Sequence, residues 1–283
     1  MTPGETTQVR VPIQPGLLPL RPLTTGELLD AAIALLRTRV WRLALLGVAV
    51  ALAEQAALFP LRRAADLDLS YLPADNRFGQ FWLLVLVGFA TEPLCIALLG
   101  GVAAAAAPGA LLGQAAPRPN RSRAVAVVVA AVLVGALCGL AGPVLLWPIA
   151  YGLLGLAVPA VVIDGLGPLR GLVRSVRLAA RTGMRATWIR LLAYGAWWMI
   201  RIALGLGGLA LVNLAYTSPS TTVDNVIMGA VWLVVNALAY PVLACLDACL
   251  HLETRMRTEG LDIALRRALH RGVATDMALA VPR

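Results

Sequence analysis

Three ionisable residues stand inside apolar stretches of the sequence and are the first candidates for chemistry. Glu54, Glu92 and Arg201 are each surrounded mainly by apolar residues. A charge at the centre of a lipid bilayer costs about 2.5 to 3.5 kcal/mol on insertion scales, so these residues require partners or water. Counted from the cytoplasmic ends of the membrane helices predicted below, all three lie at a depth of roughly 20 Å. We therefore predict an intramembrane polar cluster of Glu54, Glu92 and Arg201.

Two interpretations of this cluster remain open. It is either a substrate or proton site, or an ion-pair network that holds three helices in register. Two carboxylates against one guanidinium leave one negative charge in excess, so the sequence favours one protonated glutamate. Pro93 follows Glu92 directly and predicts a kink in the helix beside the charge.

Four arginines recur at helical spacing between residues 168 and 182. They are Arg170, Arg174, Arg177 and Arg181, and the opposite face carries Leu169, Leu172, Val173 and Val176. This phasing predicts an amphipathic helix on the membrane surface whose basic face binds anionic lipid headgroups or an acidic partner. A role in membrane orientation alone would not require the phasing, although a solvated face without a partner is the alternative.

Other patterns that could carry chemistry are weak. Cys245, Cys249 and His251 are near one another in the sequence but point around a helix, so we expect no metal site. Asp247, between the two cysteines, is expected to pair with a cytoplasmic arginine. The sequence contains no nucleophile elbow, no zinc-protease motif and no phosphate-binding loop, so we expect no enzyme and no cofactor, with an intramembrane enzyme built from carboxylates as the remote alternative.

Membrane helices must position these residues. Of the 283 residues 59% are hydrophobic and only 14% charged, which is more apolar surface than a soluble core can bury. Six apolar runs are long enough to cross a bilayer: 41–60, 81–106, 124–141, 144–163, 188–214 and 225–250. The third and fourth form one continuous apolar stretch, and Ala141-Gly142-Pro143 is the predicted turn between them. The fold class is therefore all-α, a polytopic membrane protein with six transmembrane helices.

The arginines orient these crossings. All 24 basic residues are arginine, and with 15 acidic residues the net charge is +9. Only Arg62, Arg63 and Arg77 flank the crossings on the side opposite to the remaining flanking arginines, which by the positive-inside rule places both termini in the cytoplasm. This rule explains the basic charge without a nucleic-acid partner. We predict three cytoplasmic interfacial helices at 25–38, 168–182 and 259–271, and cytoplasmic tails at 1–22 and 273–283.

Three cytoplasmic segments carry a resemblance to a known family. These are RPLTTGELLDAAIALLR, VIDGLGPLRGLVRSVRLAAR and RMRTEGLDIAL. The chain resembles the glycerophosphoryl diester phosphodiesterase membrane-domain-like family of bacterial membrane proteins over roughly residues 20 to 270. The resemblance implies a six-helix membrane module. It implies no phosphodiesterase activity, because the catalytic barrel of the namesake enzymes has no room in this chain.

From these observations we expect a non-catalytic accessory or organising module of a bacterial envelope complex, in the cytoplasmic membrane. Its expected partners are membrane lipids with anionic headgroups and another membrane protein. The alternative is a secondary transporter or lipid-handling protein that uses Glu54, Glu92 and Arg201. A dry clamp between helices favours the first interpretation, and a hydrated cavity favours the second.

Overall fold

The computed structural model describes residues 19–67, 76–113, 121–142, 146–215 and 220–271, and these residues form helices without any strand. The ten helices in the described part of the chain are α1 (Thr25–Thr38), α2 (Val40–Ala64), α3 (Phe78–Leu112), α4 (Arg121–Ala141), α5 (Trp147–Leu154), α6 (Ala157–Ile163), α7 (Pro168–Arg181), α8 (Arg185–Ala215), α9 (Thr221–Glu259) and α10 (Leu261–Arg271). The predicted all-α class is confirmed for these residues.

Five of the helices, α2, α3, α4, α8 and α9, are long and apolar enough to cross a membrane. They contain the predicted runs 41–60, 81–106, 124–141, 188–214 and 225–250, and four of them extend beyond those runs at both ends. The extension is largest in α9, whose 39 residues span about 58 Å, well beyond the hydrocarbon thickness of a bilayer. The protein is therefore a multi-pass helical membrane protein whose longest helix continues outside the lipid.

The fourth predicted crossing, 144–163, is not one continuous helix. It consists of α5 and α6, interrupted at Gly155 and Leu156. Pro159 explains the interruption, because proline lacks the amide hydrogen that would bond to the carbonyl four residues earlier and its ring clashes with that carbonyl. Ser175 of α7 satisfies the freed backbone groups: its hydroxyl accepts from the Leu156 amide at 3.1 Å and donates to the Leu153 carbonyl.

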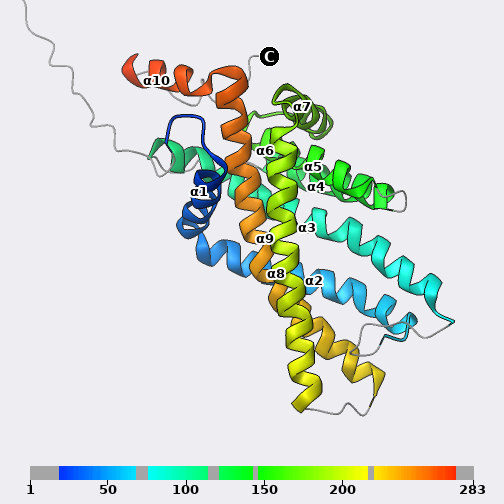
Figure 1. Cartoon of the computed structure of the whole chain (residues 1–283). Helices are drawn as coiled ribbons and strands as arrows, with labels where there is room; N and C mark the ends of the chain where they lie inside the picture. Colours follow the sequence, from blue (N-terminus) through cyan, green and yellow to red (C-terminus); the bar gives the residue numbers. More distant parts are fainter. Residues whose placement is uncertain (1–18, 68–75, 114–120, 143–145, 216–219, 272–283) are drawn as a thin grey trace, which may run out of the picture.

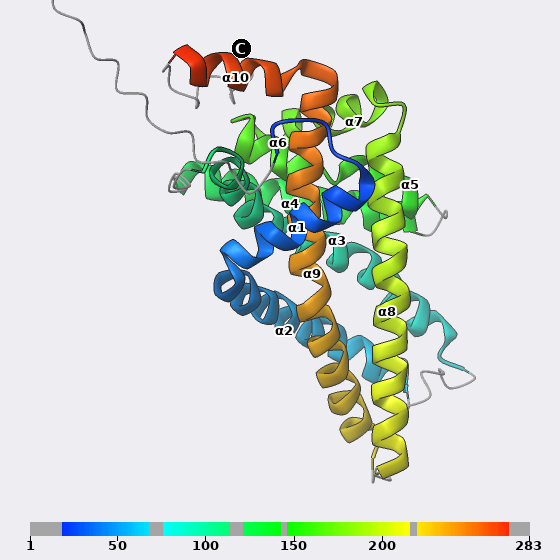
Figure 2. The ribbon, with the colours of Figure 1, turned by 60° about the vertical axis from the view of Figure 1, so that its left-hand side comes forward.

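The helices are arranged around α9. In Figures 1 and 2, α8 and α9 lie side by side along the long axis of the molecule, while α10 lies across one end of α9. Helices α1, α2 and α3 also pack on α9. Every residue of α9 from 241 to 256 is buried, so this part of α9 forms the centre of the core.

Helix α4 ends at Ala141 and packs against α5, so the chain folds back between the third and fourth predicted runs. Pro143 of the predicted turn Ala141-Gly142-Pro143 lies outside the described residues. Two glycines then allow α4 to approach α3 closely. A Cβ atom at Gly135 would lie 2.7 Å from the Ala90 carbonyl oxygen, and one at Gly139 would lie 2.7 Å from the Ala90 Cβ. Small residues at such positions are typical of helix packing within membranes.

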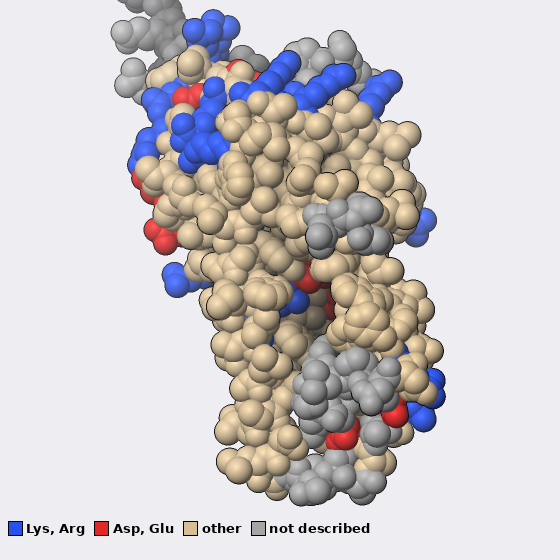
Figure 3. Space-filling view, turned by 45° about the vertical axis from the view of Figure 1, so that its right-hand side comes forward, with Lys and Arg blue, Asp and Glu red and all other residues tan. Residues whose placement is uncertain are grey.

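Helices α1, α7 and α10 cover the predicted amphipathic segments 25–38, 168–182 and 259–271 to within two residues. The tails predicted at 1–22 and 273–283 fall mostly or wholly outside the described residues. Most of the basic side chains visible in Figure 3 gather at the end of the molecule where α7 and α10 lie.

Candidate intramembrane polar site

Two of the three predicted intramembrane charges form an ion pair. Arg201 of α8 donates through Nη1 to Glu92 Oε1 of α3. The side chains are 8% and 13% exposed, so the pair is largely but not completely removed from the surface. The pair joins two helices whose backbones approach each other closely at few positions, and Tyr194 of α8 also lies beside Glu92.

The third predicted residue, Glu54 of α2, has a different set of partners. Its carboxylate accepts from the Tyr240 hydroxyl at 2.8 Å, from Asn236 Nδ2 at 2.9 Å and from the Thr91 hydroxyl at 3.1 Å. Glu54 is only 5% exposed. Three neutral donors therefore hold Glu54 in place, and they join α2 to α3 and α9.

These two groups form one cluster. Thr91, which donates to Glu54, directly precedes Glu92, and the Arg201 guanidinium carbon lies 5.5 Å from the centre of the Tyr240 ring. The structure thus brings Glu54, Glu92 and Arg201 into one region, with the ion pair confined to the last two. Sequence reasoning missed Thr91, Asn236 and Tyr240. Asn236 and Tyr240 could have been found, because they are polar and stand four residues apart in an apolar run.

The ion pair is not completely enclosed, since its side chains keep 8% and 13% of their surface exposed. The molecular surface in Figure 3 is hollowed about half-way along the molecule, and acidic and basic atoms lie at the floor of this hollow. Gly88 stands one turn before Glu92 on the same face of α3, and a Cβ atom built there would meet no atom within 4 Å. The face of α3 that carries Glu92 is therefore open next to the ion pair.

A second arginine of α8 is sealed inside the protein. Arg190 donates to both carboxylate oxygens of Asp247 on α9, at 2.7 and 3.0 Å, and its guanidinium carbon lies 3.7 Å from the centre of the Tyr151 ring. The Arg190 and Asp247 side chains are 2% and 5% exposed. The expectation that Asp247 pairs with an arginine is confirmed, but the pair is buried. A Cβ atom at Gly155 would lie 2.0 Å from Arg190 Nε, so the break between α5 and α6 also makes room for this side chain.

The predicted arginine face of α7 is divided. Arg170, Arg177 and Arg181 are exposed, whereas Arg174 is 14% exposed and pairs with Asp164 at 3.1 Å and with Glu259 at 2.5 Å. The expected apolar face is divided too. Leu172 packs into the core, and the exposed stripe consists of Leu169, Val173 and Val176.

Arg174 belongs to an ionic cluster at the C-terminal end of α9. The Asp164 carboxylate contacts His251 Nε2 at 2.9 Å, Arg255 Nη1 at 2.9 Å and Arg174 Nε at 3.1 Å. Burial alone raises the pKa of Asp164, but His251, Arg255 and Arg174 outweigh this effect and hold the pKa below its ordinary value of 3.8. The cluster joins the α6–α7 turn to α7 and α9.

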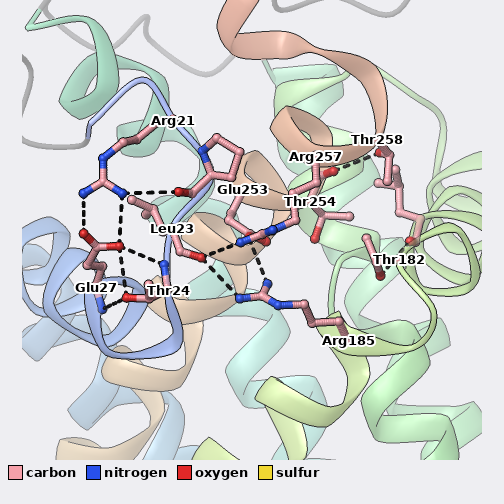
Figure 4. Close-up of polar contacts among 12 residues, drawn as sticks. Arg21, Leu23, Thr24, Glu27, Thr182, Arg185, Glu253, Thr254, Arg257 and Thr258 are labelled. Atoms are coloured by element: carbon pink, nitrogen blue, oxygen red, sulfur yellow. Dashed lines mark hydrogen bonds and ion pairs between the residues drawn. The ribbon is translucent and has the colours of Figure 1, made fainter.

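The segment before α1 is bound to the same end of the molecule. The Leu23 carbonyl accepts from Arg185 at 3.2 Å and from Arg257 at 2.8 Å, and both arginines pair with Glu253 (Figure 4). Arg266 of α10 donates to the Leu20 carbonyl at 2.7 Å. The start of the described chain therefore lies against the first turn of α8, the last turns of α9 and α10.

The first turn of α1 has a capping box formed by Thr24 and Glu27. The Glu27 amide donates to the Thr24 hydroxyl, and the Glu27 carboxylate accepts from the Thr24 amide at 2.8 Å (Figure 4). Arg21 pairs with Glu27 as well. These contacts lower the pKa of Glu27 to about 2.

Among the described residues, no group of three or more His, Cys, Asp and Glu side chains is placed to hold a metal ion. Cys95, Cys138, Cys245 and Cys249 are all buried and unpaired with each other. Comparison of the chain with protein-family models, with curated proteins and with solved structures finds no match.

Proposed function

We propose that the protein is a non-catalytic membrane module with six crossings, an accessory or organising subunit of a complex in the bacterial cytoplasmic membrane. The observation that carries this proposal is the use of its buried charges as ties between helices. Arg190 and Asp247 join α8 to α9, Glu54 joins α2 to α3 and α9, and Asp164 joins the α6–α7 turn to α7 and α9. Paired interior charges of this kind are tolerated without a ligand.

The position of the N-terminal segment supports six crossings with both termini in the cytoplasm. The Leu20 and Leu23 carbonyls bind arginines of α8, α9 and α10, so both ends of the described chain lie at one end of the molecule. A chain that begins and ends on one side crosses the membrane an even number of times. The sixth crossing is then α5 together with α6, whose residues 147–163 reach about 25 Å, close to the roughly 30 Å of a hydrocarbon core.

The exposed faces of α7 support contact with anionic lipid. Leu169, Val173 and Val176 form an outward apolar stripe, and Arg170 and Arg177 stand beside it on the same exposed side. A helix of this kind lies at the membrane surface with its apolar stripe in the lipid and its guanidinium groups at the phosphates. Helix α1, with exposed Leu29 and Ile33, is proposed to lie at the same surface.

Membership of the glycerophosphoryl diester phosphodiesterase membrane-domain-like family is part of this proposal. It rests on the three cytoplasmic segments quoted above. An all-helical chain with five long apolar helices agrees with the membrane module of that family.

Purification of the tagged full-length chain from its native membrane tests the proposed role. We expect an assembly larger than the 29.8 kDa chain that contains one other membrane protein at a fixed ratio. Crosslinking in intact membranes before solubilisation controls for association in detergent. A chain that is recovered without a stoichiometric partner in both preparations contradicts the accessory role. Reporter fusions at the two termini and between α2 and α3 test the proposed orientation.

A secondary transporter or lipid-handling protein is the second candidate. The observation in its favour is the hollow whose floor carries charged atoms, beside an ion pair that is not fully buried. Reconstituted vesicles that show solute or lipid movement in the wild type, and none after both Glu54→Gln and Glu92→Gln, would support it. Unchanged expression and movement in both variants would rule out proton coupling through these glutamates.

A further inference from the structure

Two buried polar atoms of the Glu54, Glu92 and Arg201 cluster have no hydrogen-bond partner. Arg201 Nε is a buried donor without a hydrogen-bond partner, and Asn236 Oδ1 is a buried acceptor without one. Arg201 is 7% exposed and Asn236 4% exposed. A buried donor or acceptor that lacks a partner costs roughly 1 to 3 kcal/mol, so a ligand that satisfies both atoms is favoured. The cluster therefore offers one unused donor and one unused acceptor.

The charges of the cluster indicate the kind of ligand. Arg201 presents a guanidinium, which pairs with phosphate and carboxylate groups, and Glu92 presents a carboxylate beside it. A ligand with an anion and a cation a few ångströms apart can pair with both and leave no charge uncompensated. A purely anionic ligand would be repelled by the Glu92 carboxylate, and a purely cationic ligand would be repelled by the Arg201 guanidinium.

The cation of such a ligand must be able to donate hydrogen bonds. The cluster offers two acceptors for N–H donors: the Glu92 carboxylate, which pairs with Arg201, and Asn236 Oδ1, whose side chain is held by Glu54. A primary ammonium supplies three N–H donors, whereas a quaternary ammonium supplies none. The cluster thus discriminates between an ethanolamine and a choline headgroup.

The opening of the site faces the lipid. The backbones of α3 and α8, which carry Glu92 and Arg201, approach each other closely at few positions, with Tyr194 of α8 as a second neighbour of Glu92. Both helices are long enough to cross the membrane. Open space at Gly88 lies next to Glu92, and Trp198, Met199 and Ile200 of α8 are exposed on the lipid-facing surface. A ligand that enters between the two helices arrives from the bilayer and carries its acyl chains there.

We propose that this cluster binds the headgroup of an aminophospholipid. The phosphate pairs with Arg201 and satisfies Nε, while the primary ammonium pairs with Glu92 and donates to Asn236 Oδ1. Glu54 remains with Thr91, Asn236 and Tyr240 and positions Asn236. The inference deepens the second candidate function by naming the lipid class. It is independent of whether the protein also serves as an accessory subunit.

The test is lipid binding to the full-length protein in detergent, measured by native mass spectrometry. The protein carries Arg170→Gln and Arg177→Gln throughout, which removes the exposed guanidinium groups of α7 that would bind anionic lipid. The probes are phosphatidylethanolamine, its mono- and dimethylated forms, phosphatidylcholine and phosphatidylglycerol. We expect one phosphatidylethanolamine per chain, weaker binding with each added methyl group, and phosphatidylcholine and phosphatidylglycerol at least about tenfold weaker.

Two variants and a matched control locate the binding. Arg201→Gln removes the phosphate partner and is expected to lower phosphatidylethanolamine binding at least about tenfold. Gly88→Leu fills the open space while keeping the ion pair, so it reports on the site even where Arg201→Gln fails to fold. Gly195→Leu makes the same change at another open position, on a face of α8 directed away from Arg201, and is expected to bind like the parent.

Three outcomes overturn the proposal: equal binding of phosphatidylcholine, strongest binding of phosphatidylglycerol, or undiminished binding in Gly88→Leu. Soluble phosphoethanolamine distinguishes the two sources of the headgroup. If phosphoethanolamine displaces the lipid at equal concentration, the site binds the free compound and the proposal of a lipid ligand is overturned. If it does not displace the lipid, the proposal of a lipid ligand is supported. None of these results depends on the partner assembly of the proposed module, which is measured separately, so the two proposals fail independently.

Discussion

Two arginine–carboxylate pairs of α8, Arg190 with Asp247 and Arg201 with Glu92, differ in how closely the protein encloses them. Arg190 and Arg201 lie on nearly the same face of the helix, roughly 16 Å apart along its axis, and each pairs with a carboxylate of another helix. Arg190 makes two hydrogen bonds with Asp247, lies against Tyr151 and joins helices that pack closely. Arg201 makes one with Glu92 and joins helices whose backbones approach each other closely at few positions. Each guanidinium keeps one nitrogen without a partner, Nη1 in Arg190 and Nε in Arg201. Enclosure by neighbouring helices, and not the charges themselves, separates a structural tie from a candidate binding site.

The largest expected effect concerns the sealed pair. Asp247→Leu leaves the Arg190 guanidinium buried without its carboxylate and is expected to lower the free energy of unfolding by about 3 to 5 kcal/mol. Thermal unfolding of the purified protein in detergent measures the change. The double variant Arg190→Leu/Asp247→Leu removes both charges and should recover most of the loss. A double variant as unstable as Asp247→Leu would show that the pair itself is required.

Gly155→Ala breaks the enclosure of Arg190 without touching either charge. The added Cβ would lie 2.0 Å from Arg190 Nε, so the guanidinium must move away from Asp247. We expect a loss of about 1 to 3 kcal/mol in the free energy of unfolding, as for other overpacked sites. Gly195→Ala, in open space within α8, is the control and should be neutral or slightly stabilising. Equal stability of the two variants would contradict the close fit at Gly155.

A smaller effect is expected at the open pair. Arg201→Gln removes one charge from a pair that retains some access to the surface, and polar contacts within membranes are worth about 1 kcal/mol. A double-mutant cycle of Arg201→Gln with Glu92→Gln should therefore give a smaller coupling energy than the cycle of Arg190 with Asp247. A coupling energy as large as that of the sealed pair would place the Arg201–Glu92 pair among the structural ties.

The smallest effect within the accessible pH range concerns a third arginine–carboxylate group, at Asp164. Because its folded-state pKa lies below 3.8, the Asp164 carboxylate contributes stability that is fully present above that pH and lost as the pH falls towards the folded-state value. The difference in Tm between the wild type and Asp164→Asn should be constant from pH 7 to about pH 5 and shrink below about pH 4. A difference that grows on acidification would show that the pKa of Asp164 is raised and not lowered.

Much of the secondary structure could be predicted because it depends on local composition. Apolar runs of bilayer length and the capping box at Thr24 and Glu27 need no knowledge of distant residues. The interruption at Gly155 was missed. Pro148 and Pro159 both lie within an apolar run, and prolines within membrane helices are often accommodated without a break.

Side-chain partners were harder to predict. Similar depth correctly suggested that Glu54, Glu92 and Arg201 come together, but depth does not say which charges pair. Arg174 shares its helical spacing with Arg170, Arg177 and Arg181, yet among these four it alone pairs with Asp164, because it lies next to the buried face of α7. Glu259 pairs with Arg174 at 2.5 Å and with Arg181 at 4.0 Å. Arg62 was predicted to flank a crossing, but the sequence did not indicate that its side chain is buried and donates to Gln55 at 2.7 Å.

The sequence by itself determined that this chain is helical and membrane-spanning, because the burial of apolar runs in lipid depends on composition and length alone. It also determined that three charges had to find partners inside the bilayer, since the cost of an isolated charge there does not depend on the fold. Only the tertiary structure decided that Glu54 is held by neutral donors, that Arg190 is enclosed and that Arg201 borders an opening. Those outcomes depend on which helices are neighbours and how closely they pack, and residues far apart in the chain set both.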